Sequence, residues 1–148
     1  GLNLLDIETT LQPDKITNQI EAQIINKKLF DLEAGKVISG YEIHMGQTNL
    51  GPKAEPVFKI RKRSDQQVEI VDGACSLNQQ VWGTYLHGVF ANDQLRWEFI
   101  NQLRKQKGLA PVSDNFSVRE KREEAYNKLA ELVRENLNLE LLYEIMGL

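Results

Sequence analysis

Apolar and polar positions alternate along much of the first half of the chain, which is the pattern of half-buried β-strands. On this basis we expect strands over residues 15–25, 36–45, 57–60 and 67–71. An amphipathic helix is the alternative for the first of these segments, but a period near two fits its apolar positions better. The apolar residues of 1–10 favour burial, and Pro13 is expected to close that opening segment. Turn-forming residues predict turns at 31–35 and 72–73 and an irregular loop at 48–56.

The alternation in residues 36–45 predicts which side chains share a face of the sheet. Glu42 and His44 lie on the same face, about 6–7 Å apart along the strand, with Gly40 and Gly46 on either side. An acid and an imidazole placed in this way suit a polar ligand. A simple cross-strand salt bridge explains the same pattern equally well.

Residues 81–90, VWGTYLHGVF, indicate a buried strand that ends at His87, with a helix beginning almost at once. A histidine at such a junction lies where α/β enzymes commonly place their chemistry. The alternative is a hydrogen-bonded, purely structural histidine, and this stretch by itself favours that alternative.

Helical periodicity replaces alternation in the second half of the chain. A helix is expected over 93–107 with an apolar stripe on one side and Gly108 as its stop. Ser117 and Glu120 form the capping-box pattern that opens a second helix. That helix breaks near 136–138, and a short helix follows over 139–146, whose apolar stripe we expect to serve packing rather than a cofactor.

Composition and charge narrow the class of protein. The 148 residues suffice for one domain, and 41% hydrophobic and 26% charged residues are ordinary for a soluble globular chain. The net charge of −3 gives no basic footprint for nucleic acid, and the basic run at 59–63 is interpreted as a solvated hairpin turn. The sequence shows no signal peptide or membrane span, so we expect a cytoplasmic protein.

The single cysteine and the two histidines further restrict the possible chemistry. Cys75, the single cysteine, fits a reducing compartment and lies between two expected strands. A nucleophilic cysteine needs a positive or helix-N-terminal setting, so Cys75 is interpreted as a packing residue. Cys75, His44 and His87 are too scattered for a metal site, and we expect none.

Two motifs in order carry a family resemblance. Residues 40–46, GYEIHMG, and residues 81–90 resemble the glutamine amidotransferase domain of the cobyric acid synthase family. The opening residues 1–6, GLNLLD, and 8–10, ETT, resemble the segment that this family carries between its nucleophile and its later strands. The resemblance runs to about Gly108, and the helical tail matches only in general character.

This resemblance implies a class I, triad-type glutamine amidotransferase. The implied fold is α/β, a partial flavodoxin-like domain with a mixed sheet and C-terminal helices, divided into a strand-rich core over 1–108 and a helical tail over 109–148. By position, His87 matches the histidine that accepts a thiol proton and returns it to ammonia. His44 lies where related enzymes contact glutamine, and Glu42 is expected to orient one of the histidines.

The resemblance also implies partners outside these residues. A synthetase domain uses ATP and Mg²⁺ to amidate a corrinoid, adenosylcobyrinic acid a,c-diamide, in cobalamin biosynthesis. The chain would be the C-terminal part of the amidotransferase domain. Its nucleophilic cysteine is expected before Gly1, and the fragment by itself is expected to be inactive. A partial sheet would expose an edge and favour self-association.

One departure from the wider amidotransferase pattern lies next to the histidine. Most triad enzymes carry a glutamate two residues after it, where this chain has Val89; the cobyric acid synthase branch resembles the chain in lacking that glutamate. Two alternatives stay open: a related enzyme, such as cobyrinic acid a,c-diamide synthase or a cell-wall amidating enzyme, and a noncatalytic α/β binding module.

Overall fold

The computed structural model describes residues 2–29, 35–113 and 116–148, and the chain divides into two compact units, residues 1–113 and 114–148. The first unit holds a sheet, one short 3-10 helix and one α-helix: β1 (Ile7–Ile24), β2 (Val37–Leu50), β3 (Ala54–Arg63), β4 (Gln66–Ser76), β5 (Trp82–Gly83), β6 (Leu86–His87), η1 (Val89–Ala91) and α1 (Asp93–Gln106). The second holds α2 (Val118–Asn136) and α3 (Leu139–Met146).

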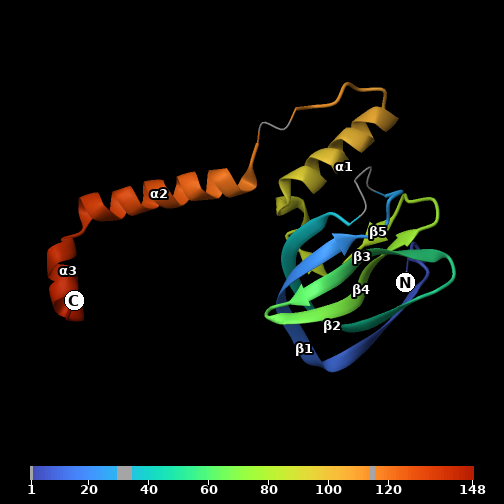
Figure 1. Ribbon diagram of the computed structural model, residues 1–148, viewed down its shortest axis with the longest axis horizontal. Coiled ribbons are helices and arrows are strands. Elements are labelled where there is room, and N and C mark those ends of the chain that lie inside the picture. The colour runs from blue at the N-terminus through green and yellow to red at the C-terminus, as the bar shows by residue number, and fades with distance from the viewer. Residues whose placement is uncertain (1, 30–34, 114–115) are drawn as a thin grey trace. The chain divides into compact units, whose positions relative to one another are not determined.

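The sheet is strongly curled (Figure 1). Its strand order is β5-β4-β3-β1-β2-β6, and the two edge strands are separated in the chain only by Thr84 and Tyr85. Three Cα–Cα steps of about 3.8 Å therefore keep the edges within about 11 Å of each other. Each edge strand is two residues long, which limits the backbone that is open to pairing. Self-association stays a prediction.

The α/β class with C-terminal helices is confirmed, but the pairing of the sheet differs from the mixed sheet that we expected. Every strand pairing among the described residues is antiparallel. Short connections explain the β3–β4 and β4–β5 pairings, because parallel neighbours need a long crossover connection.

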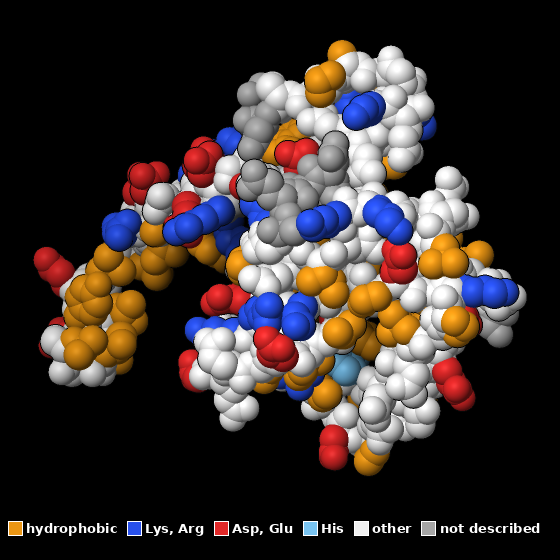
Figure 2. Space-filling view, turned by 45° about the vertical axis from the view of Figure 1, so that its right-hand side comes forward, with side chains coloured by type: hydrophobic (Ala, Val, Ile, Leu, Met, Phe, Trp, Pro, Cys, Tyr) orange, Lys and Arg blue, Asp and Glu red, His pale blue; other side chains and the backbone are white. Residues whose placement is uncertain are grey.

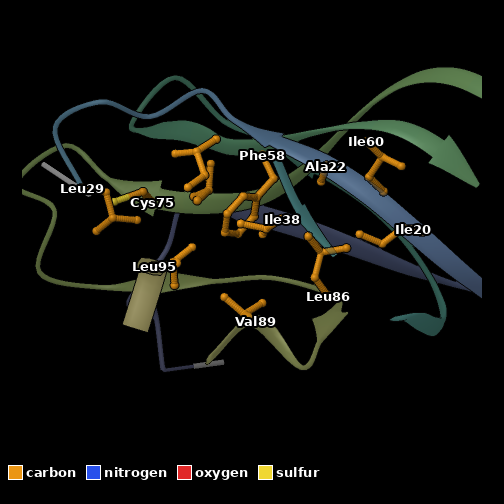
Figure 3. Packing of buried hydrophobic residues seen from close by; sticks show 12 residues of the cluster. Ile20, Ala22, Leu29, Ile38, Phe58, Ile60, Cys75, Leu86, Val89 and Leu95 are labelled. Carbon is orange, nitrogen blue, oxygen red and sulfur yellow. The ribbon is translucent and has the colours of Figure 1, made fainter. Parts of the chain in front are cut away.

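The core lies on the concave side of the curled sheet and under the start of α1. Alternate residues of the central strands face inward, including Ile20, Ala22 and Ile24 of β1, and Leu95 of α1 completes the cluster (Figure 3). The period of two in these strands is therefore confirmed by burial. Cys75 is 0% exposed within this cluster, as a packing residue should be.

The N-terminal third differs from expectation at two points. Pro13 does not end a segment, because β1 runs through it as one strand from Ile7. Pairing with β2 shifts register between Leu11 and Ile16, and this irregularity accommodates a residue that has no amide hydrogen. The apolar residues at the start are not buried: Leu2, for example, is 86% exposed. Most of the turn expected at 31–35 lies outside the described residues.

Two predicted interruptions of the sheet are wrong. Most of the loop expected at 48–56 belongs to β2 and β3, which leaves residues 51–53 as the connection. Residues 72–73, expected as a turn, lie inside β4, where Gly73 has a φ of 76°. A side chain at Gly73 would also lie 3.0 Å from the Gly83 carbonyl oxygen, so this glycine permits a kink and a close approach rather than a chain reversal.

The stretch 81–90 is not one buried strand. It forms β5, a two-residue connection, β6 and then η1, which begins after Gly88 with a φ of 78°. The predicted continuous strand fails because this segment passes from one edge of the sheet to the other.

The helical predictions are largely confirmed. α1 ends before Gly108, whose φ is 67°, and the Ser117 hydroxyl accepts the Glu120 amide at 3.3 Å. The apolar stripes of the second unit are exposed, however, with Ile145 at 75% (Figure 2 shows hydrophobic side chains gathered along this part of the chain). The packing expected for the last helix is therefore not provided by the described residues.

Candidate functional site

Glu42 and His44 meet on the inner face of β2, as their spacing predicted. The Glu42 side chain is 2% exposed, and its Oε1 lies 2.9 Å from Nε2 of His44. The other ring nitrogen, Nδ1, lies 2.6 Å from the carbonyl oxygen of Gly46. A carboxylate oxygen and a carbonyl oxygen are both hydrogen-bond acceptors, so each ring nitrogen of His44 lies against an acceptor.

Arg63, at the end of β3, completes this group. Its Nε and Nη2 donate to Oε2 and Oε1 of Glu42, both at 2.6 Å, which is the bidentate geometry of a strong charge-assisted pair. The sequence did not reveal this role, because residues 59–63 were interpreted together as a solvated turn. A register shift between Ile60 and Lys62 changes the face to which the last residues point, and no sequence pattern indicated it.

Glu42 therefore stays ionised despite its burial. Burial by itself raises the pKa of Glu42, but the hydrogen bonds from Arg63 and His44, together with their charges, outweigh it and lower the pKa below its ordinary value of 4.5. One buried carboxylate, bonded to Arg63 and His44, forms the electrostatic centre of the site.

Tyr85 connects this centre to the segment between the sheet edges. Its ring stacks on His44 with a centroid distance of 4.2 Å and an interplanar angle of 14°. The hydroxyl of Tyr85 lies 2.6 Å from that of Thr48, which in turn lies 2.8 Å from the hydroxyl of Thr9. Tyr85 therefore contacts β2 directly and is linked to β1 through Thr48.

Asp72 of β4 also binds the segment between the sheet edges, through Thr84 and Tyr85. Its carboxylate accepts a hydrogen bond from the Thr84 hydroxyl and a longer one, at 3.4 Å, from the Tyr85 amide. Burial raises the pKa of Asp72 above its ordinary value of 3.8, although the bonds from Thr84 and Tyr85 oppose this effect. The sequence indicated a turn here, since Asp-Gly is a common turn signal, so the role of Asp72 was missed.

These groups line a cavity of about 510 Å³. Its polar wall includes Glu42, His44, Arg63, Asp72, Thr84 and Tyr85, and apolar side chains of β1, β2 and β4 form much of the rest. Figure 2 shows a histidine side chain set among hydrophobic side chains at a hollow of the surface. The arrangement is a preformed concave site with a few convergent polar groups.

His87 lies on the opposite face of the sheet from this cavity. In the antiparallel ladder of β2 and β6, Glu42 is paired with Leu86, and Tyr41 is paired with His87. Paired residues share a face, so His87 is on the side of the exposed Tyr41, whereas Glu42 is on the buried side. His87 is exposed and does not line the cavity. The structure thus brings together Glu42 and His44 but not His87.

Cys75 does not line the cavity, and it is not on the exposed face with His87. Its side chain is fully buried in the core, and burial raises the pKa of its thiol, with a further contribution from the charge of Glu55. Within residues 2–29, 35–113 and 116–148, no three His, Cys, Asp or Glu side chains are grouped as metal ligands. In the same part of the chain, no helix is long and apolar enough to span a membrane.

Comparisons with known proteins agree with one another. The model of a family described as CobB/CobQ-like glutamine amidotransferase domain matches residues 1–95. The chain is 39% identical over 148 residues to the cobyric acid synthase of Thermoanaerobacter sp. (strain X514), covering 99% of the chain and 29% of the relative. The cobyric acid synthases of Caldanaerobacter subterraneus subsp. tengcongensis and Streptococcus sanguinis (strain SK36) are each 40% identical, over 99% of the chain and 29% and 28% of the relatives. The chain spans less than a third of the length of these relatives.

Proposed function

The chain belongs to the CobB/CobQ-like glutamine amidotransferase family, and we propose that it forms part of a site that releases ammonia from glutamine for an ATP-driven amidation. The similarity to three cobyric acid synthases supports adenosylcobyrinic acid a,c-diamide as the acceptor. We assign the use of ATP and Mg²⁺, and the corrinoid contacts, to a synthetase domain outside these 148 residues.

In the proposed chemistry, His87 is the general base and then the general acid. It accepts the proton of a cysteine thiol as the sulfur attacks the side-chain amide carbon of glutamine. It then returns this proton to the leaving nitrogen, so ammonia departs and a thioester remains. Water hydrolyses the thioester to glutamate and restores the thiol. Protons and electrons balance in each step, and water is the only reactant besides glutamine.

One observation supports this role for His87 most directly. Its backbone is held in the ladder with β2, while its imidazole is exposed and makes no hydrogen bond or ion pair with another described side chain. The backbone of His87 is thus held in place, while its imidazole is open to a reacting group. By contrast, both ring nitrogens of His44 already have partners, which makes His44 unsuitable as the base.

In the proposed reaction, the nucleophile is a cysteine other than Cys75. Cys75 is the single cysteine of the chain, and it is buried with a raised thiol pKa. A raised pKa leaves little thiolate near neutral pH, and burial blocks the approach of glutamine. A cysteine elsewhere in a longer protein is therefore part of the proposal.

The binding role expected for Glu42 and His44 stays a prediction, and the geometry supports an indirect form of it. Both oxygens of Glu42 accept from Arg63, and one of them also accepts from His44, so the pair has little remaining capacity for an amide substrate. Their location across the sheet from His87 also separates them from the reacting atoms.

Chemical rescue tests the role of His87. In the complete protein that contains this chain, His87→Ala should lower the release of glutamate from glutamine by about 100-fold or more, because general acid–base catalysis is lost. Added imidazole should restore part of the rate, since the site of His87 is open to solvent. Unchanged glutamate release in His87→Ala would contradict the proposal.

A further inference from the structure

We propose that Arg63 is a positioning residue for His87, and that the chain of contacts Arg63–Glu42–His44–Tyr85 fixes His87 from the opposite face of the sheet. This inference rests on the proposed function of His87. It assigns a role to an arginine that the sequence motifs do not include.

The first link is rigid. Arg63 donates hydrogen bonds to both oxygens of Glu42 at 2.6 Å, and the Glu42 side chain is 2% exposed. These bonds orient the carboxylate. A bidentate pair fixes an angle as well as a distance, which a single contact does not. The same carboxylate then holds Nε2 of His44 at 2.9 Å, while Gly46 holds Nδ1. The imidazole plane of His44 is thereby set.

The second link passes from His44 to the segment that precedes His87. The ring of Tyr85 stacks on the ring of His44, with a centroid distance of 4.2 Å, and its hydroxyl is anchored to Thr48. Leu86 is the only residue between Tyr85 and His87. A displaced Tyr85 would therefore shift the short strand β6 along or away from β2.

The third link is the contact between β2 and β6 themselves. Glu42 is the ladder partner of Leu86, so the residue gripped by Arg63 also borders His87 through the backbone. At Gly40, a Cβ atom would lie 2.5 Å from the carbonyl oxygen of His87, so the two backbones are in close contact. The position of His87 therefore depends on where the 40–44 segment of β2 is held.

Arg61 provides a matched control on the same strand. It pairs with Glu69, whose side chain is 67% exposed, and its Nε donates to Gln23 at 2.7 Å. Arg61 contacts none of the groups Glu42, His44 and Tyr85 in the described interactions. Replacing Arg61 removes the same charge from β3 without loosening the contacts that lead to His87.

The test compares nitrogen donors in the complete protein. For Arg63→Met, kcat with glutamine should fall by about 10- to 100-fold, because displacement of a reacting group by about 1 Å has an effect of this size. The KM for glutamine should change little, and amidation driven by free ammonia should stay at the wild-type rate. Arg63→Lys should recover part of the loss, and Arg61→Met should behave as the wild type.

A second variant covers the case in which Arg63→Met does not fold. His44→Phe keeps a ring against Tyr85 but loses both hydrogen bonds, so it should show the same loss of kcat with glutamine only. Equal rates for Arg63→Met and Arg61→Met, or an equal loss with both nitrogen donors, would overturn the inference. Failure of the proposed function has a different signature, since His87→Asn itself would then keep its activity with glutamine.

Discussion

Glu42 is buried and bonded to Arg63 and His44, and its ionisation therefore contributes to folding in a pH-dependent way. Its pKa in the folded chain is lowered from 4.5, since the bonds from Arg63 and His44 outweigh the opposing effect of burial. The resulting stabilisation is present above pH 4.5 and is lost as the pH falls through the lowered folded value. Acid should thus weaken the contacts around Glu42.

The variant Glu42→Gln tests this sign. Near pH 7 it should lower the free energy of unfolding by about 2–3 kcal/mol, because charge-assisted bonds from Arg63 and His44 are lost in a buried place. The difference from the wild type should shrink as the pH falls through the folded pKa, because protonated Glu42 is also neutral. Urea unfolding at several pH values measures it. A difference that grows with acid would show that Glu42 is not stabilised in its ionised form.

At the residue scale, part of the site could be predicted from the sequence. Strict alternation in β2 was enough to place Glu42 and His44 on one face. Arg63 could not be placed, because the bulge in β3 intervenes, and Asp72 was misassigned because Asp-Gly is ambiguous between a turn and a kinked strand. Irregular backbone carries side chains to places that periodicity does not indicate.

At the scale of elements, the short ladder between β2 and β6 is the feature that places His87. It has two paired positions, and a close backbone approach at Gly40 supports it. The sequence suggested a single strand from residue 81 to His87, since apolar residues and glycines there resemble a buried strand. The segment instead passes from one edge of the curled sheet to the other, and this tertiary arrangement overrides the local preference for a strand.

Replacing Gly40 with alanine tests the close approach. The added Cβ would lie 2.5 Å from the carbonyl oxygen of His87, so the strands must separate, and overpacking of this kind costs about 1–3 kcal/mol. Hydrogen exchange should show lost protection of the amides that pair β2 with β6. Gly83→Ala is the control, because its nearest neighbour, Leu5, would lie at 3.9 Å. Equal protection in the two variants would show that the contact does not determine the ladder.

At the scale of the whole molecule, the curled sheet separates two kinds of surface. One face holds the cavity with its buried charges, and the other presents His87 next to exposed side chains. This division could not be read from the motifs, because residues 40–46 and 81–90 each contribute to both faces. The expected helices of the second unit formed where the capping and periodic patterns placed them, since these signals are local.

The central claim is that His87 serves glutamine hydrolysis and not the amidation step. The most direct measurement is the ratio of glutamine-driven to ammonia-driven amidation in the complete protein with His87→Asn. We predict that the glutamine-driven rate falls by about 100-fold or more while the ammonia-driven rate is retained, because ammonia supplied from solution needs no proton transfer by His87. An equal loss with both nitrogen donors, or no loss with either, would contradict the account.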